Sequence, residues 1–134
     1  MGLKGIVVVC GLAGLFAAVP AARDGSRIER GRYLVERVSM CGECHTPRNN
    51  RGELDRNRWL KGAPIPVKSP FKGRSWAFQA PPIGGLHGWK PAEVARILEK
   101  GARSSGRRSR PPMPGFRMSR EDAQAVAAYL QSLR

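Results

Sequence analysis

The chain has 134 residues, 41% of them hydrophobic and 25% charged, so we expect one folded domain with a short extension rather than two domains. Its 24 Lys and Arg against 10 Asp and Glu give a formal charge of +14, which favours encounters with acidic partners and opposes self-association. The charge therefore predicts a class of partner and leaves the fold open.

The N-terminus has a composition of its own. Lys4 is followed by an uncharged apolar run, GIVVVCGLAGLFAAVPAA, which ends at Ala22. A basic start, an apolar core and small residues at the end are typical of an export signal, here with cleavage before Ala22. The run also reaches the lower length limit for a membrane span, so an uncleaved anchor stays open. We assign residues 1–21 as signal peptide or N-terminal membrane anchor and residues 22–134 as the folded domain.

An amphipathic helix is predicted from Ser26 to Val38. Its apolar residues fall on one helical face, and its charged residues fall on the other. Ser26 suits the N-cap position at the start of this helix. The apolar face consists of Ile28, Gly31, Leu34, Val35 and Val38.

The segment MCGECHTPR, residues 40–48, carries the most specific signal in the chain. Cys41 and Cys44 are three positions apart, so each thiol can add to one of the two vinyl groups on one edge of a porphyrin. His45 then falls under the ring, where its imidazole can bind the iron from one side. The spacing therefore favours a single covalently attached haem, that is, haem c.

Two other uses of paired cysteines compete with haem. A zinc site needs four ligands, and after residue 21 the only other imidazole is His87, while Cys44 and His45 are adjacent. A redox dithiol is expected between a strand and a helix, and this setting is absent from the predicted elements. In an exported chain the pair can also oxidise to a disulfide. Short helices with long loops need a large group to complete their core, which again favours haem.

A long loop and a second helix are predicted next. The stretch 49–88 is rich in proline and glycine, so we expect an ordered loop rather than strands. So long a loop in a small domain needs something to wrap around. The second helix is predicted from Pro91 to Lys100, because Pro91 suits a first helical position and Gly101 suits the stop after the last.

The other side of a haem iron needs a sixth ligand in an electron-transfer site. The candidates are Met40, Met113, Met118 and His87. Met113 is favoured, because prolines on both sides of it in RPPMPGF stiffen the segment and hold the thioether at little ordering cost. Met40 adjoins the cysteine motif, Met118 suits the core, and the glycines around His87 favour an exposed loop. A thioether with an imidazole raises the reduction potential relative to two imidazoles and leaves no open site, which indicates electron transfer.

The last helix is predicted to begin after Ser119. Ser119 and Asp122 form a capping pair, and Met118 precedes them as a hydrophobic staple. Its buried face is Ala123, Val126, Ala127, Leu130 and Leu133, with Tyr129 at the edge. The predicted fold class is therefore all-α, with three or more short helices and long Pro/Gly loops around one covalent haem.

These segments together resemble a known family. CGECHTPR with PPMPGFRMSREDAQAVAAYLQSL is similar to the class I cytochromes c, most closely to small monohaem domains that serve as subunits or partners of periplasmic bacterial dehydrogenases. The resemblance runs from Gly31 to Leu133 and includes GRYLV and APPIGGLHGW, while the intervening loop matches loosely. It implies the class I cytochrome c fold, in which the first and last helices cross with Gly31 close to Tyr129.

The resemblance also implies the roles of the haem-binding residues. These are thioether attachment at Cys41 and Cys44, a proximal iron ligand at His45 and a distal iron ligand at Met113. No catalytic residue is implied. The loop with Trp59, Arg74 and Trp76 is expected to cover the haem propionates. Lys90 departs from the family, which often has a small capping residue before this helix.

The implied function is to carry one electron between a periplasmic dehydrogenase or respiratory donor and an acceptor such as a terminal oxidase. The chain is then expected in the periplasm, soluble or anchored to the inner membrane. A haem sensor or ligand-binding cytochrome with a labile Met113 is an alternative. A basic zinc or nucleic-acid-binding protein is another, but the export signal and the missing second ligand pair oppose it, so no nucleic-acid partner is expected.

A basic segment surrounds the favoured methionine. Residues 103–120 contain no acid and six arginines, namely Arg103, Arg107, Arg108, Arg110, Arg117 and Arg120. In the resembling family this segment lies near the exposed haem edge, so we expect the arginines to steer an acidic redox partner, with an effect that salt weakens. A solvated basic surface, or one that faces anionic lipid, remains an alternative.

Overall fold

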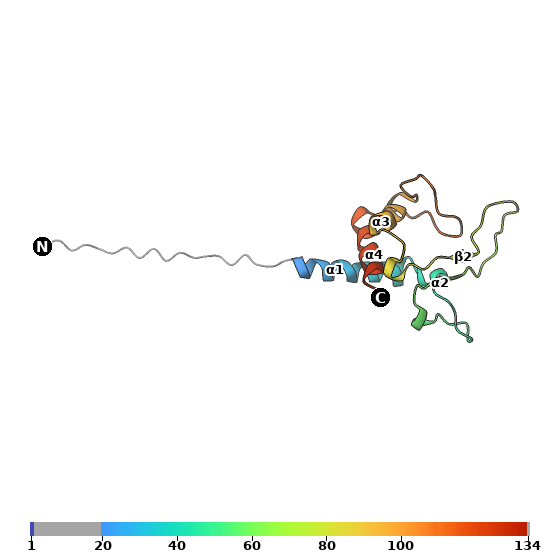
Figure 1. Ribbon diagram of the computed structural model, residues 1–134, viewed down its shortest axis with the longest axis horizontal. Coiled ribbons are helices and arrows are strands. Elements are labelled where there is room, and N and C mark those ends of the chain that lie inside the picture. Colours follow the sequence, from blue (N-terminus) through green and yellow to red (C-terminus); the bar gives the residue numbers. More distant parts are fainter. Residues whose placement is uncertain (2–19, 134) are drawn as a thin grey trace.

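The first helix, α1, runs from Pro20 to Tyr33 in the computed structural model, which describes Met1 and residues 20–133 (Figure 1). The predicted N-cap at Ser26 is wrong, because the helix already includes the preceding residues, among them the good helix formers at positions 21–23. The expected signal or anchor segment, residues 1–21, lies almost entirely outside the described residues. Within 20–133, no helix is both long and apolar enough to cross a bilayer.

A wider helical turn joins α1 to the cysteine motif. Residues Leu34–Val38 form a π-helical segment, in which the Ser39 amide donates to the Leu34 carbonyl at 2.7 Å. The short helix α2, Gly42–His45, follows directly. Between them Met40 adopts a left-handed backbone with φ 48°, which turns the chain from one helix into the other.

The proline- and glycine-rich stretch is ordered, as predicted, but it contains some regular structure. Two 3-10 turns, Arg56–Arg58 and Gly84–Leu86, lie in it. Two short strands, β1 (Ala63–Pro64) and β2 (Gln79–Ala80), pair antiparallel with Ala63 opposite Ala80. Strands of two residues give no alternating pattern, so the sequence offered no sign of them.

The two later helices agree with their local signals. Helix α3 spans Pro91–Lys100, with Pro91 in its first turn, and Gly101 ends it in a left-handed conformation with φ 70° that suits glycine. Helix α4 spans Arg120–Ser132, and the Ser119 side chain accepts from the Asp122 amide at 3.1 Å. Lys90 makes no side-chain capping bond at the start of α3.

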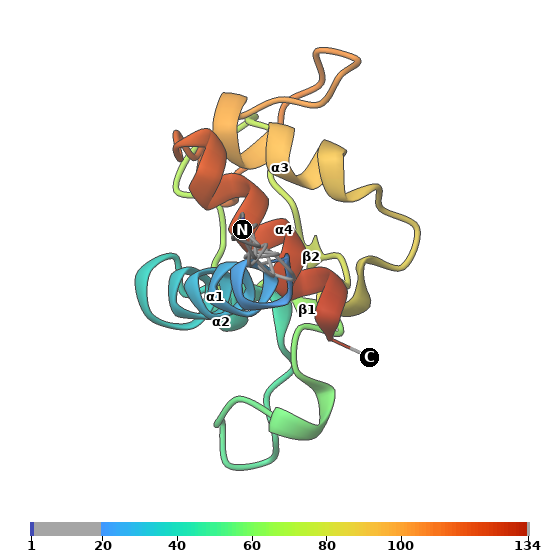
Figure 2. The ribbon, with the colours of Figure 1, turned by 90° about the vertical axis from the view of Figure 1, so that its left-hand side faces the viewer.

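Helix α4 packs against both α1 and α3, and Figure 2 shows α4 lying across α1. The closest approach is at Gly31, which is buried against the backbone of Ala125 and beside Tyr129. A side chain at position 31 would meet the carbonyl oxygen of Ala125. The expected crossing of the first and last helices at Gly31 is therefore confirmed.

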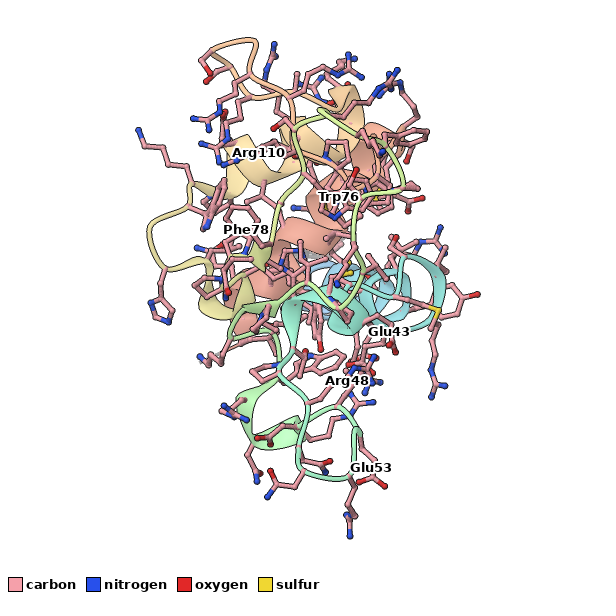
Figure 3. The ribbon with its side chains drawn as sticks, turned by 90° about the vertical axis from the view of Figure 1, so that its right-hand side faces the viewer. Glu43, Arg48, Glu53, Trp76, Phe78 and Arg110 are labelled. Atoms are coloured by element: carbon pink, nitrogen blue, oxygen red, sulfur yellow. The ribbon has the colours of Figure 1, made fainter. Side chains whose placement is uncertain are left out.

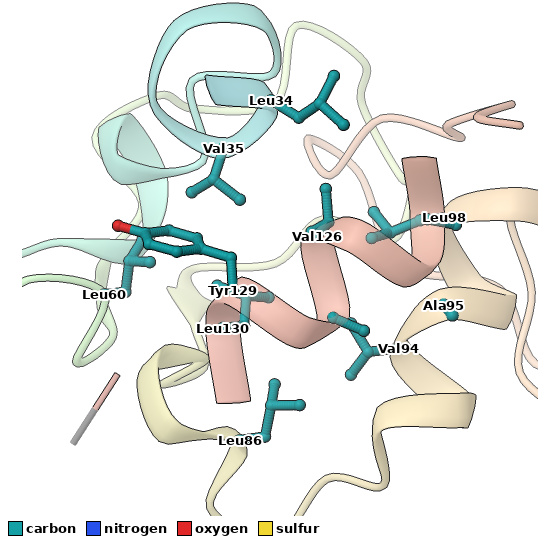
Figure 4. Close-up of a cluster of buried hydrophobic side chains, with 12 residues drawn as sticks. Leu34, Val35, Leu60, Leu86, Val94, Ala95, Leu98, Val126, Tyr129 and Leu130 are labelled. Carbon is teal, nitrogen blue, oxygen red and sulfur yellow. The ribbon is translucent and has the colours of Figure 1, made fainter. Parts of the chain in front are cut away.

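Side chains of α3, α4 and the π-helical segment form most of the core, and Leu60 and Leu86 complete it from the long loop (Figure 4). The sequence predicts Tyr129 at the edge of the buried face of α4, but only 5% of the residue is exposed. Its hydroxyl donates to the Glu36 carboxylate at 2.7 Å, which satisfies the one polar atom that burial would otherwise strand. The mainly helical domain confirms the predicted fold class. The buried core residues are Leu34, Val35, Leu60, Leu86, Val94, Ala95, Leu98, Ala123, Val126, Ala127, Tyr129 and Leu130.

Candidate functional site

Helix α2 holds the CxxCH motif on a single turn. The Cys41 amide donates to Val35 in the π-helical segment at 3.0 Å, and the His45 amide donates back to Cys41 at 3.0 Å. Gly42 leaves room for the indole ring of Trp59, which packs directly against this turn. The two cysteines and the histidine are therefore fixed by backbone bonds at both ends of a very short helix.

The imidazole of His45 is buried, with 7% of the residue exposed. Its Nδ1 lies 2.8 Å from the carbonyl oxygen of Pro81. A carbonyl can only accept, so Nδ1 carries the proton and Nε2 keeps a free lone pair for a metal. Burial lowers the pKa of His45, and the bond to Pro81 opposes this shift. The ring is therefore held in the neutral form that ligates iron.

Both cysteines of the motif are free and half-buried. Burial raises the pKa of Cys41 to about 11, with a smaller contribution from Cys44. The Cys41 thiol is therefore protonated at neutral pH. Addition of a thiol across a vinyl group uses both its sulfur and its proton, so free thiols at these positions suit thioether formation.

A cavity of about 370 Å³ opens beside α2. Cys41, Cys44 and His45 line it, and Met113 lines it from the loop between α3 and α4. Its volume falls within the range of about 300–1,000 Å³ that is usual for ligand cavities. The rest of its wall is largely apolar and includes Ile65, Ile83, Val94, Ile97, Leu98, Phe116, Val126 and Leu130.

The four candidates for a sixth ligand lie in different places. Met113 and Met40 line the cavity, but Met40 directly precedes Cys41 and more than half of it is exposed. Met118 packs against the hydrophobic core and does not line the cavity. His87 is exposed and also lies away from the cavity. Met113 is thus the sulfur donor that comes to the cavity from an element remote from the cysteine motif.

Three residues of the loop expected over the haem propionates, Trp59, Arg74 and Trp76, do not line the cavity. The Trp76 indole donates to the Val67 carbonyl at 3.0 Å, and the Arg74 guanidinium lies 5.0 Å from the ring centroid of Phe71. Neither side chain lines the cavity, and Trp59 does not line it either. The expectation that their loop covers the propionates stays a prediction, and the three side chains have contacts outside the cavity lining.

The arginines of residues 103–120 divide into two groups. Arg103, Arg107, Arg108 and Arg110 line the cavity, whereas Arg117 and Arg120 do not. Arg117 donates to the carbonyls of Phe116 and Lys100 at 3.0 Å and 3.5 Å. The sequence predicts one role for all six, the steering of an acidic partner. Their different directions depend on the fold of the loop, which residue type alone does not specify.

A covalently bound haem fits these residues. Two free thiols, an imidazole with one nitrogen available and a remote thioether all line one cavity with a largely apolar wall. No Asp or Glu lines it within the described chain. Nor do three or more His, Cys, Asp or Glu side chains of that part of the chain gather to hold a metal ion.

Comparison with protein families agrees with this site. Residues 26–130 match the family described as Cytochrome C oxidase, cbb3-type, subunit III. The chain belongs to this cytochrome c family. As a cytochrome c domain with a single CxxCH motif, it carries one covalently bound haem c.

Three curated relatives are cytochromes, and two of them are named as dehydrogenase cytochrome subunits. The chain is 37% identical over 108 residues to the "Diheme cytochrome c-type" of Cereibacter sphaeroides, covering 77% of this chain and 34% of that protein. It is 32% identical over 114 residues to the "Fructose dehydrogenase cytochrome subunit" of Gluconobacter japonicus, covering 78% and 21%. It is 30% identical over 132 residues to the "Gluconate 2-dehydrogenase cytochrome c subunit" of Pantoea cypripedii, covering 85% and 28%. The matched part of the chain thus spans between 21% and 34% of the length of each relative.

Proposed function

We propose that this cytochrome c domain carries single electrons on a haem attached at Cys41 and Cys44 and ligated by His45 and Met113. The observation that supports it is the meeting of these four side chains on one cavity, although Met113 is far from the others in sequence. The haem iron supplies a one-electron ferric/ferrous couple, so the donor loses one electron and the acceptor gains one. The buried histidine and the loop-held thioether keep other ligands from the iron in both oxidation states.

Visible spectroscopy of the haem-loaded protein tests the ligand set. Sharp α and β bands after reduction indicate low-spin haem c, and the oxidised protein is expected to show the weak far-red band of methionine ligation. In Met113→Leu this band should disappear and the reduction potential should fall, because the soft sulfur favours ferrous iron. Met118→Leu is the matched control, because that methionine packs in the core.

Two results would refute this ligand set. One is an unchanged far-red band in Met113→Leu together with its loss in Met118→Leu or Met40→Leu. The other is rapid carbon monoxide binding by the reduced wild-type protein, which would indicate an open or labile sixth position. Such binding would instead support the haem sensor that the sequence left open.

We also propose that the physiological partner is an acidic redox protein, such as a dehydrogenase subunit or a terminal oxidase, met in the periplasm after export. The chain carries a formal charge of +14, and two curated relatives are named as dehydrogenase cytochrome subunits. Phe78 is 81% exposed, next to Ala77 on the cavity wall, and Figure 3 shows it on the same side of the molecule as Arg110. An exposed aromatic ring beside basic residues suits a docking face for an acidic protein.

The rate of electron transfer to a purified partner tests the docking proposal. Because attraction between exposed charges is screened beyond about 8 Å at physiological salt, the second-order rate should fall steeply as salt is added. A rate that stays constant from low to high salt would refute it.

Cell fractionation tests the proposed export. Separating periplasm from membranes, followed by N-terminal sequencing of the haem-stained band, decides between a cleaved signal and a retained anchor.

A further inference from the structure

Four arginines on the cavity wall have no anionic partner among the residues that the structure describes. Arg103, Arg107, Arg108 and Arg110 line the cavity, and none of them takes part in an ion pair with a described residue. Three of them, Arg107, Arg108 and Arg110, are exposed, so their guanidinium groups can reach an anion held at this wall. The arrangement therefore calls for a ligand that is apolar over most of its surface and anionic at one end.

These side chains come from a defined structure, the arginine hairpin, residues 102–110. Ala102 and Arg108 pair antiparallel, and the Arg103 amide donates to the Arg107 carbonyl at 2.9 Å. The hairpin is fastened to α3 by the Glu93 carboxylate, which accepts from the Ser104 amide at 3.0 Å and from its hydroxyl at 3.3 Å. The nearby acid thus binds the hairpin backbone and leaves the guanidinium groups free for another anion.

One arginine of the hairpin is already held in place. The Arg103 guanidinium lies 4.6 Å from the ring centroid of Trp89, and both side chains line the cavity. Stacking on an aromatic face leaves the N–H groups at the edge of the guanidinium available for hydrogen bonds. Arg103 is therefore pre-positioned, whereas Arg107 and Arg110 are exposed and can adjust to a ligand.

A haem is apolar over most of its surface and anionic at one edge, which matches the apolar wall and the arginines of this cavity. The vinyl groups lie towards one edge of the porphyrin, and the two propionates lie towards the opposite edge. Thioethers at α2 would fix the vinyl edge, so the propionates must point away from α2. In Figure 3, Glu43 of α2 and Arg110 of the hairpin lie at opposite sides of the view, with the segment around Phe78 nearer to Arg110.

We propose that the arginine hairpin binds the haem propionates, with Arg107 and Arg110 as their main ionic partners and Arg103 in support. The proposal rests on the haem placement under the proposed function and assigns residues that the family match does not name. Arginine suits a carboxylate because two parallel N–H groups match its two oxygens. Guanidinium charge at this edge also favours the reduced iron, because the added electron is attracted to it.

The test compares the haem-loaded double variant Arg107→Gln/Arg110→Gln with Arg120→Gln. Arg120 belongs to the same basic segment and is exposed, but it does not line the cavity. Each protein is measured by spectroelectrochemical titration at low and high salt and by resonance Raman spectroscopy of the propionate bending band. The two single variants are measured in parallel, so that poor folding of the double variant does not end the comparison.

In the double variant we expect the equilibrium constant for reduction to fall by about tenfold, which is a 59 mV lower potential for one electron. The fall should persist at high salt, because a direct ion pair is screened far less than a surface charge. The propionate band should shift as well. Arg120→Gln should leave the band unchanged, and any effect on its potential should vanish at high salt.

The proposal is overturned if the variants hold low-spin haem with the wild-type potential and propionate band at high salt. An equal shift in Arg120→Gln would also overturn it, because net charge would then explain the result. Failure of the proposed function looks different. In that case the wild-type protein itself lacks covalent haem or a low-spin spectrum, before any arginine is changed.

Discussion

Gly31→Ala should separate α1 from α4. An added Cβ would overlap the carbonyl oxygen of Ala125, and it would lie 2.6 Å from the carbonyl carbon of that residue and 2.8 Å from Cβ of Tyr129. Backbone atoms and a Cβ cannot rotate away, so the helices themselves must move. Overpacking costs about 1–3 kcal/mol, and a contact with backbone belongs at the upper end of that range. Alanine offsets about 1 kcal/mol of this through its better helix propensity, so a net loss of about 2 kcal/mol remains.

Thermal unfolding of the haem-loaded protein, followed by far-ultraviolet circular dichroism, measures this loss. With about 4 °C for each kcal/mol in a domain of this size, Gly31→Ala should melt about 8 °C below wild type. Gly25→Ala is the matched control in the same helix, because nothing lies within 4 Å of its added Cβ. It should melt at or slightly above the wild-type temperature. A Gly31→Ala protein as stable as wild type would refute the close approach of the two helices.

Two further changes test single hydrogen bonds. Tyr129→Phe removes the 2.7 Å bond to Glu36 and should lower the unfolding free energy in urea by about 1 kcal/mol. Burial, and then the bond to Glu36, raise the pKa of Tyr129 from 10.0 to about 12, so the unfolded tyrosine ionises first. Wild-type stability should therefore fall as pH rises from about 10 to about 12, and a variant with the same fall would contradict this. Ser119→Ala removes the cap that accepts from Asp122 and should cost about 1 kcal/mol by urea titration, with a stability equal to wild type as the contrary result.

The parts of the fold that sequence predicted well are those with local causes. Helix α3 begins at Pro91 and ends before Gly101 because each residue favours its position through its own backbone geometry. Ser119 caps α4 through a bond to a residue three positions away. The CxxCH motif is of the same kind, since one helical turn brings its three reactive side chains to one wall.

The parts that sequence missed depend on contacts between distant segments. The resemblance places the loop with Trp59 over the propionates, but the sequence gives no sign that Gly42 creates the space that receives the Trp59 ring. The sequence prediction puts Tyr129 at the edge of the buried face of α4, whereas its burial depends on the bond from its hydroxyl to Glu36 in the π-helical segment. In both cases the residue type is compatible with several positions in the fold. A contact with a residue distant in sequence determines which position the side chain adopts.

The arginine-rich segment illustrates the same limit and has a consequence for docking. If the hairpin arginines compensate the propionates, the segment presents less free charge to a partner than its six arginines indicate. Docking then depends more on exposed arginines outside the cavity lining, such as Arg117 and Arg120. The two roles respond differently to salt, because screening weakens long-range attraction but affects a direct ion pair much less. A protein whose electron-transfer rate falls with salt while its hairpin-dependent potential stays constant would show both roles within one short segment.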